Sequence, residues 1–466
     1  MTPPEDRRQP NVLLVLADQW RGCDQGWNGN VEVLTPHLDA LAGAGVAVPH
    51  AYANTPVCGP SRASLLTGEL PRTHHVVAND LPLRRGLPTM ASILAEAGYH
   101  TGWIGKWHLD GLPRDKWVPP ERRAGFDYWA ANNCSHAYFD AHYYEGGTDQ
   151  PVSFQGYEPD IQTRLAIDFV DAGSQPWFLV VSYGPPHDPY EDVPEEYLSR
   201  YDPGRLTPRH NAPRTSEQRA LQRQYYSGIS AVDDQIGRLR GHLDALGCLD
   251  DTVLVVTSDH GDMLGSHGRR AKQVPYEEAV NVPLVVTWPR ALTPRTGVPG
   301  LLGLVDLPPS LLGLVGVEPP AEWYGRDLSR AWCDGVAARD AVLLGNAVSF
   351  DEGARQGVRP WRGFRDAVRT YARHVDGHPW LLFDNEQDPF QEANLVAVGS
   401  PRAVKDADEL LTELLRDAGD EPVDGPVILR QLGLVAEWNA RELELNGLSP
   451  RLLGDNGTDE DLNEEP

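Results

Sequence analysis

Side chains that can bind a metal, carry a positive charge or transfer a proton follow directly after several short apolar runs of this chain. An Asp at the end of a strand commonly caps a turn, and an isolated His commonly makes a structural hydrogen bond, so no single one of them indicates a reaction. Loops that only reverse the chain have no reason to collect Lys and His together, however, so the whole set indicates one site that binds a cation and moves protons. The residues are Asp18 and Gln19 after residues 12–17, Lys106 and His108 after 100–105, His187 after 177–186, and Asp259 and His260 after 252–258.

The apolar runs alternate with amphipathic stretches over the first three quarters of the chain, a pattern typical of strands joined by crossover helices. We therefore expect an α/β fold with a mostly parallel central sheet flanked by helices. Because ligands of such sheets bind outside the carboxyl ends of the strands, the residues above should meet at one edge of the sheet. The expected strands are 12–17, 177–183, 252–257 and 283–288; the expected helices start near Thr35, near Pro88 (with Pro88 in the first turn and Gly98 as C-cap) and at Ser216.

From about residue 340 the pattern changes to shorter runs separated by turn residues. It predicts a smaller C-terminal α+β subdomain with an antiparallel sheet, followed by a helix near residues 404–417. The last residues are acidic and nearly free of large apolar side chains, which is typical of a solvated tail. The predicted division is a catalytic domain over residues 1–340, a C-terminal subdomain over 341–440 and a flexible acidic tail over 441–466.

Charge and composition exclude several classes of function. The 41 Lys and Arg residues against 67 Asp and Glu residues give a net charge of −26, which repels nucleic acids and anionic membranes. No run approaches the roughly 20 apolar residues that cross a bilayer, and the polar N-terminus lacks the apolar segment of a signal peptide. We therefore expect a cytoplasmic protein with no nucleic-acid or membrane partner. Five cysteines without CxxC spacing indicate neither a disulfide framework nor a zinc site.

The segment VCGPSRASLLTG, residues 57–68, carries a longer pattern. Its string C-x-P-S-R-x-x-x-L-T-G, starting at Cys58, resembles the maturation signal of the type I sulfatases of the alkaline phosphatase superfamily, in which the Cys is oxidised to Cα-formylglycine. Without this string, Cys58 would be interpreted as a small buried hydrophobe. The resemblance extends to about residue 400 through ADQWRG (17–22), GKWHL (105–109), PPHDPY (185–190), SDHGDMLGSHG (258–268), Lys272 and FDNEQDPFQEANL (383–395).

This resemblance implies hydrolysis of a sulfate ester to alcohol and sulfate, with the hydrated formylglycine at position 58 as the nucleophile. It also implies one divalent metal, for which Ca²⁺ is the family precedent and Mg²⁺ or Mn²⁺ are alternatives. Many sulfatases have two Asp at the first ligand pair and Asp-Asn at the second, so Gln19 and His260 depart from the pattern, and His260 could instead hydrogen-bond to a ligand. The implied ligands are Asp18, Gln19, modified Cys58, Asp259 and His260.

The resemblance also assigns roles around the nucleophile. Arg62 supports the formylglycine hydroxyl, and Lys106 and Lys272 hold sulfate oxygens. His108 is the candidate base, and His187, with Lys272, is the candidate acid for the leaving alcohol, although spacing alone does not decide which His does which. The implied substrate-binding residues are Lys106, His187, Lys272 and Asn79, the last facing the leaving group.

The nature of the substrate stays open between a sugar, an aryl and an alkyl sulfate. The aromatic-rich residues 129–144, with Asn132, Asn133, His136, Tyr138 and His142, either line a pocket for it or form an ordinary packed loop. His74, His75 and His267 are assigned as structural or substrate-edge residues.

Two other functions remain as alternatives. A phosphonate monoester or phosphodiester hydrolase shares the fold, the formylglycine and the Asp-Gln and Asp-His pairs, but Lys106 and His108 favour a sulfatase. A non-catalytic anion-binding protein would keep Cys58 as an unmodified thiol. The expected partners are a small sulfate ester and a formylglycine-generating enzyme, and a homo-oligomer is left open.

Overall fold

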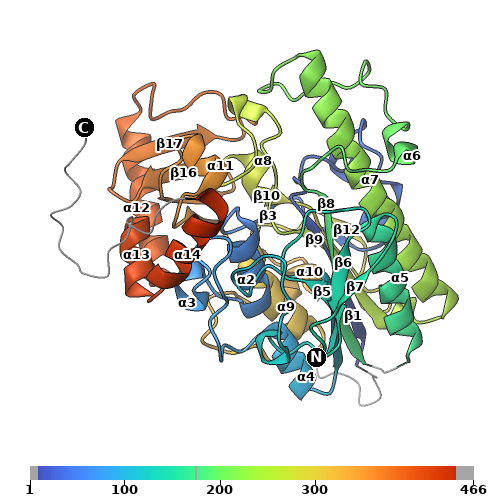
Figure 1. The fold of residues 1–466 in the computed structure, drawn as a ribbon. Helices are drawn as coiled ribbons and strands as arrows, with labels where there is room; N and C mark the ends of the chain where they lie inside the picture. Colours follow the sequence, from blue (N-terminus) through green and yellow to red (C-terminus); the bar gives the residue numbers. More distant parts are fainter. Residues whose placement is uncertain (1–8, 174–175, 448–466) are drawn as a thin grey trace.

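A large, mixed β-sheet forms the centre of the molecule (Figure 1). The computed structural model describes residues 9–173 and 176–447, and within them the sheet has ten strands in the order β12-β2-β11-β9-β1-β8-β4-β5-β6-β7. The five strands from β9 to β5 are parallel, whereas β11, β6 and β7 are antiparallel to their neighbours. The bounds are β1 Asn11–Asp18, β2 Val46–Ala47, β4 His100–Lys106, β5 Tyr128–Asn132, β6 His142–Glu145, β7 Pro151–Ser153, β8 Trp177–Pro186, β9 Thr252–Ser258, β11 Leu284–Thr287 and β12 Arg295–Thr296.

Strand β1 lies between β8 and β9, and all eight of its residues are buried. Its side chains alternate between two apolar clusters: Leu13 and Val15 belong to one, and Leu14 and Leu16 to the other. A strand covered on both faces in this way needs apolar residues at every position, which is why β1 reads as a continuous apolar run.

Helices cover both faces of this sheet. Helices α1, α5 and α7 contribute to the cluster that contains Leu13, and α2, α4, α9 and α10 contribute to the cluster that contains Leu14. Figure 1 shows α5 and α7 together on one side of the sheet. The bounds are α1 Pro36–Ala44, α2 Cys58–Thr67, α3 Pro71–His74, α4 Met90–Glu96, α5 Glu158–Asp171, α6 Glu195–Leu198, α7 Ser216–Ala245, α8 Glu277–Val280, α9 Leu307–Leu314 and α10 Ser329–Asp334, with 3₁₀ turns η1 Gly26–Asn28, η2 Pro120–Arg122, η3 Leu249–Asp251, η4 Ser266–Gly268 and η5 Leu304–Asp306.

A second, smaller layer is built from the C-terminal residues, drawn in orange and red in Figure 1. Four antiparallel strands, β14 to β17, pair in sequence order, and helix α12 packs Ala407, Leu411 and Leu415 against them. A three-stranded sheet, β10-β3-β13, is also present in the described chain. The bounds are β3 Ala51–Tyr52, β10 Asn281–Val282, β13 Leu302–Gly303, β14 Ala341–Asn346, α11 Asp351–Arg355, β15 Trp361–Asp366, β16 Arg369–His374, β17 Pro379–Asp384, α12 Pro401–Asp417, α13 Gly425–Gln431 and α14 Val435–Asn446.

The predicted fold class is confirmed: a mostly parallel central sheet, flanking helices and a C-terminal antiparallel sheet are all present. Helix α4 differs from the prediction at both ends. Thr89 is its N-cap and forms a capping box with Ser92, so Pro88 lies before the helix. Its C-cap is Ala97, and Gly98 follows the C-cap. Helix α14 runs to Asn446, so residues 441–446 are helical and not part of a tail; residues 448–466 of the predicted tail lie outside the described residues. No helix in the described ranges is both long and apolar enough to cross a membrane.

Candidate active site

The carboxyl ends of four parallel strands meet the start of helix α2 at one edge of the central sheet. Asp18 and Lys106 are the last residues of β1 and β4, and Asp259 follows the last residue of β9. His187 follows β8 in the same way, and Cys58 is the first residue of α2. The structure therefore brings together the groups that the sequence predicted at this edge.

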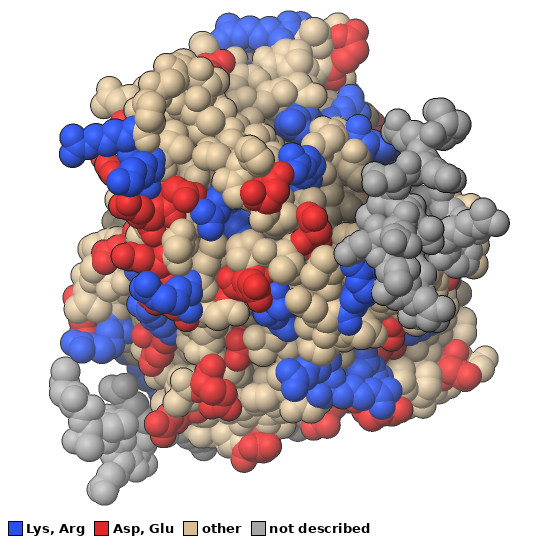
Figure 2. All heavy atoms as spheres, turned by 90° about the vertical axis from the view of Figure 1, so that its left-hand side faces the viewer, with Lys and Arg blue, Asp and Glu red and all other residues tan. Residues whose placement is uncertain are grey.

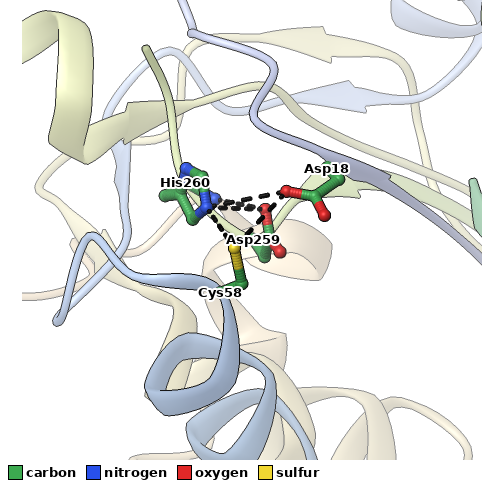
Figure 3. Close-up of side chains that lie close together, drawn as sticks. All are labelled: Asp18, Cys58, Asp259 and His260. Atoms are coloured by element: carbon green, nitrogen blue, oxygen red, sulfur yellow. Dashed lines mark hydrogen bonds and ion pairs between the residues drawn. The ribbon is translucent and has the colours of Figure 1, made fainter. Parts of the chain in front are cut away.

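Four buried side chains form the centre of the site: Asp18, Cys58, Asp259 and His260 (Figure 3). Their ligand atoms all lie within 4.8 Å of one another. Cys58 Sγ is 3.8 Å from Asp18 Oδ1 and 3.2 Å from His260 Nε2, and His260 Nε2 is 3.6 Å from both Asp18 Oδ1 and Asp259 Oδ1. We call this group the four-residue cluster.

The orientation of His260 suits a metal ligand. Its Nδ1 is 2.8 Å from the backbone carbonyl oxygen of Gly261, which can only accept a hydrogen bond, so Nδ1 carries the proton. In the neutral ring, Nε2 then presents its lone pair to the cluster. A hydrogen bond of this kind fixes the ring orientation of metal-binding histidines in general.

Gln19 contacts the four-residue cluster through its backbone N–H, which donates to Asp259 Oδ1 at 3.1 Å. Its backbone has a positive φ of 70°, and its amide Nε2 donates to Asp262 Oδ2 at 2.8 Å and to the hydroxyl of Tyr190 at 3.2 Å. Because the amide nitrogen of Gln19 is bonded to Asp262 and Tyr190, the amide oxygen Oε1 is the atom left to bind a cation. Lys272 Nζ donates to this oxygen at 2.8 Å.

Arg62 joins the two carboxylates of the cluster. Its Nε donates to Asp259 Oδ2 at 2.8 Å, its Nη2 is 3.5 Å from Asp18 Oδ2, and its Nη1 donates to Ser182 Oγ at 2.7 Å. Burial opposes the charge on Arg62, but Asp259 and Asp18 raise its pKa nonetheless. Arg62 is therefore held as a cation beside the nucleophile position.

Gly105 explains how Lys106 reaches the cluster. Its φ is 95°, and a Cβ at this position would lie 2.1 Å from the carbonyl oxygen of Ser182, so only glycine fits. The bend directs Lys106 inward, where Nζ donates to Asp18 Oδ2 at 2.5 Å. Burial raises the pKa of Asp18, but Lys106, His187 and Arg62 together hold it far below its usual value.

Cys58 lies in an electropositive setting. Lys272 Nζ is 3.0 Å from its sulfur. Burial alone would raise the pKa of the thiol, but Lys272, Lys106 and His260 outweigh burial and lower the pKa well below the ordinary value. Such surroundings are typical of a reactive cysteine and not of an inert, buried one.

A pair of stacked histidines closes one side of the site. The rings of His187 and His136 are 4.2 Å apart and nearly parallel. His187 Nδ1 is 2.7 Å from the carbonyl oxygen of Asp188, which leaves Nε2 directed at Lys272 Nζ, 3.0 Å away; His136 Nε2 lies 3.0 Å from Lys106 Nζ. Burial and Lys272 lower the pKa of His187, but Asp18 and Asp188 contribute to a net rise, so His187 can carry a proton.

His108 and Asn79 contact the site from the helix α2 side. His108 Nε2 is 3.1 Å from Asp80 Oδ1, and the His108 imidazole influences the pKa of Cys58. The side-chain oxygen Oδ1 of Asn79 accepts from the backbone N–H of Gly59 at 2.8 Å. Asn79 therefore holds the first turn of α2, and its Nδ2 is the donor left for a leaving group.

Sequence reasoning missed several neighbours of these residues. Asp80, Ser182, Asp262 and Tyr190 all bond a predicted site residue, and His136 was assigned only to the uncertain pocket region. Ser182 lies inside β8, four residues before its last residue, so the strand-exit pattern that found His187 does not reach it. His74 and His267 are structural: His74 lies 3.2 Å from Ser64 Oγ, and His267 stacks on Tyr276.

The donor set fits a divalent cation. Two fully buried carboxylates and one imidazole lone pair converge, with the oxygen of Gln19 close by. Buried carboxylates without a cation repel one another, and among the described residues Arg62, Lys106, Lys272 and His187 offset their charge. Oxygen-rich sites prefer Ca²⁺, Mg²⁺ or Mn²⁺.

Two family models match the chain. The model described as "Sulfatase" matches residues 10–317, and that described as "N-sulphoglucosamine sulphohydrolase, C-terminal" matches residues 265–418, across the boundary predicted at 340. Among similar curated proteins, the "Ulvan-active sulfatase" of Formosa agariphila is 37% identical over 90% of this chain and 83% of its own length. The "Choline-sulfatase" of Rhizobium meliloti is 29% identical over 83% of this chain and 82% of its own.

Solved structures share the fold. A putative sulfatase from Bacteroides fragilis superposes with a TM-score of 0.83 at 30% identity, covering 90% of this chain and 98% of that one. The phosphonate monoester hydrolase of Agrobacterium radiobacter superposes with a TM-score of 0.73 at 24% identity, covering 88% of this chain and 96% of that one. The second likeness shows the shared fold alone.

Proposed function

This chain belongs to the sulfatase family of the alkaline phosphatase superfamily and hydrolyses sulfate esters, and we propose that a formylglycine made from Cys58, beside a divalent cation, performs the reaction. The observation that carries the proposal is the position of Cys58. Its sulfur lies at the start of α2, against Asp18, His260 and Lys272.

The ligands proposed for the cation are Asp18, Asp259, His260, the Gln19 amide oxygen and the group at position 58. A bound cation would act as a Lewis acid, easing loss of a proton at position 58 and balancing charge on a sulfate oxygen. Ca²⁺ is our first candidate because hard oxygen donors predominate, and the His260 ring nitrogen keeps Mn²⁺ and Mg²⁺ as alternatives.

The protein's own cations do the rest of the binding. Lys272 Nζ lies 3.0 Å from the sulfur of Cys58, and Lys106 Nζ donates to the neighbouring Asp18, so a sulfate placed at position 58 would meet two ammonium groups. Fixed charges of this kind stabilise the transition state because they are already oriented before the reaction. Arg62 holds the two carboxylates in place through its rigid donor fork.

We assign the acid and base roles from geometry. His187 presents Nε2 to the site and can be protonated, which suits the acid that delivers a proton to the leaving alcohol. His108 is then the base, since it interacts with the group at position 58 and, unlike His260, is not a proposed ligand of the cation. The stacked partner of His187, His136, lies at the same side of the site and is positioned to contact the leaving group.

We further propose a sulfated saccharide as the substrate. The supporting observations are the printed activities of the relatives, among them the ulvan-active sulfatase and an "N-acetylglucosamine-6-O-sulfatase" of Bacteroides thetaiotaomicron. Phosphodiester and phosphonate cleavage remain side activities to test, because a tetrahedral anion of similar size would meet the same cations. A formylglycine-generating enzyme is the partner that maturation would require.

The mass of the peptide that contains Cys58 tests the proposal. Conversion of the thiol to the aldehyde makes the peptide about 18 Da lighter, and we expect this form in active preparations only. Chelation should abolish turnover of an aryl sulfate, and Ca²⁺, Mg²⁺ or Mn²⁺ added singly should identify the ion by recovery. An unmodified Cys58 in a fully active preparation would contradict the proposal, as would activity that survives exhaustive chelation.

A further inference from the structure

We propose that Asp80 is a positioning residue for His108, and that Arg441 of helix α14 belongs to the active site through Asp80. The inference rests on the proposed function, in which His108 accepts a proton at position 58. It assigns a role to a carboxylate and to a C-terminal arginine that neither the sequence pattern nor the four-residue cluster includes.

The Asp80 carboxylate is saturated with hydrogen-bond donors. His108 Nε2 lies 3.1 Å from Oδ1, Arg114 donates from Nε and Nη2 at 2.7 and 2.8 Å, and Arg441 Nε donates to Oδ2 at 3.2 Å. Burial opposes ionisation, but Arg114 and His108 hold the pKa of Asp80 far below its usual value. An ionised carboxylate can only accept, so His108 Nε2 must carry a proton.

The consequence for His108 is that Nδ1 is the ring nitrogen left to react. Nδ1 is buried and has no hydrogen-bond partner among the residues that the structure describes. Besides Asp80, the ring interacts with the thiols of Cys134 and Cys58. With Nε2 bonded to a fixed anion, Nδ1 is oriented toward position 58 as a proton acceptor, and the negative charge of Asp80 makes it a stronger base.

Both members of this pair have an unusual backbone. His108 has a φ of 62° and Asp80 a φ of 65°, a left-handed conformation that is uncommon for residues other than glycine. Each such residue costs about 1 kcal/mol or more and persists only where its surroundings enforce it. Two facing residues held in this conformation indicate that their side-chain contact is specified by the fold.

Arg441 supplies the support from the far side of Asp80. Its side chain is fully buried, Nη2 donates to Asp351 Oδ2 at 2.6 Å, and the guanidinium lies over the rings of Phe350 and Trp438 at 4.7 and 5.1 Å. A buried arginine held by two rings and by three carboxylates, those of Asp80, Asp351 and Glu442, is fixed in this position. Helix α14 therefore connects the C-terminal subdomain, through Arg441 and Asp80, to His108, the proposed catalytic base.

The test is the variant Asp80→Asn, which keeps the size of the side chain and removes its charge. We expect kcat to fall by about 10- to 100-fold, the range for losing a residue that orients another, with KM within about 3-fold and an unchanged fraction of modified Cys58. The matched control is Asp306→Asn, which breaks another buried ion pair, Asp306 with Arg339, far from the cluster in sequence. It should lower thermal stability and leave kcat unchanged.

A readout independent of turnover is the ring N–H of His108 in protein with ¹⁵N-labelled histidine, assigned by its loss in His108→Gln. We expect a slowly exchanging Nε2–H in the wild type and its loss in Asp80→Asn. This measurement holds even if Cys58 is unmodified, so failure of the proposed function and failure of this inference are distinguishable. A wild-type resonance protonated at Nδ1 alone would overturn the inference.

Arg441 gives a second series in case Asp80→Asn does not fold. We expect kcat to fall in the order wild type, Arg441→Lys, Arg441→Met, because Lys keeps the charge but places its donors on a single nitrogen, whereas Met removes both the charge and the donors. The Nε2–H resonance should exchange faster in the same order. Wild-type kcat and exchange in a folded Arg441→Met would show that helix α14 has no part in the site.

Discussion

Asp18 is the residue on which most contacts of the site converge. Its carboxylate meets Lys106 at 2.5 Å, Arg62 at 3.5 Å and His260 at 3.6 Å, and none of these side chains is more than slightly exposed. At such distances and with so little water, an ion pair is far stronger than on a surface. The state of Asp18 therefore depends on each partner, and removing one leaves a buried charge with less compensation.

Replacement of Lys106 by Ala should lower kcat/KM for a sulfate ester about 100- to 1,000-fold, the usual effect of deleting one fixed charge that faces the transition state. The comparison variant Lys405→Ala removes an exposed lysine of α12 and should be silent. Circular dichroism should show that both variants are folded. If folded Lys106→Ala turned over substrate at the wild-type rate, Lys106 would have no part in the reaction.

At the scale of single residues, the sequence predicts which residues form the site better than it predicts which residues contact one another. Asp18, Lys106, His187 and Asp259 could be found because each lies at or directly after a strand end, where parallel strands place their residues together. Asp80 could not be found, because its role comes from a turn of unusual backbone and from arginines 34 and 361 positions away. No periodicity along the chain encodes such a contact.

At the scale of elements, helix α12 was predictable from its apolar residues, which recur every four positions at Ala403, Ala407, Leu411 and Leu415. Helix α14 was not. Its buried positions include Trp438 and Arg441, and a sequence pattern assigns an arginine to the surface by default. Because the ion pairs of Arg441 form only through tertiary contacts, the sequence did not show that residues 441–446 of the predicted tail belong to a helix.

Leu411 anchors α12 to the C-terminal sheet, where it packs with Leu343, Phe364 and Leu382 and is fully buried. We expect Leu411→Ala to lower the free energy of unfolding by about 2–5 kcal/mol, since the deletion leaves a cavity in this layer. Leu443→Ala on α14, where the residue is 52% exposed, should change it by less than about 0.5 kcal/mol. Chemical denaturation measures both, and equal effects would contradict the packing described for α12.

Helix α5 begins with a buried carboxyl group, Glu158, whose pKa burial raises to about 8 against the opposing effects of Lys106 and Asn132. In the unfolded chain this group ionises near its ordinary pKa of 4.5, so the unfolded state loses its proton first as pH rises. Stability should therefore fall between about pH 4.5 and 8 and then level off.

Glu158→Gln removes this dependence. We expect the variant to match the wild type near pH 4.5 and to exceed its unfolding free energy by about 1–3 kcal/mol at pH 8. Glu121→Gln, at an exposed position, is the matched control for loss of one negative charge. A difference between Glu158→Gln and wild type that did not grow over this pH range would show that Glu158 is ionised in the folded protein.

At the scale of the whole molecule, the net charge of −26 opposes the approach of an anionic substrate. The opposing charge is not concentrated in one area of the face that Figure 2 shows, where Lys and Arg lie interspersed with Asp and Glu. The repulsion by the net charge acts at long range, whereas Lys106, Lys272 and Arg62 act at contact distance inside the site. Salt weakens the long-range repulsion far more than it weakens the attraction at contact distance.

Substrate capture should consequently improve with ionic strength. Screening acts over about 30 Å at 0.01 M salt and about 8 Å at 0.15 M, so we expect kcat/KM for a monosulfated saccharide to rise about 2- to 5-fold between these concentrations of sodium chloride. A disulfated analogue carries twice the charge and should show the steeper rise, which serves as the internal control, while kcat should stay constant because contacts within the bound complex are little screened. A kcat/KM that falls as salt is added would mean that the buried cations, and not the acidic surface, dominate the field that an approaching sulfate meets.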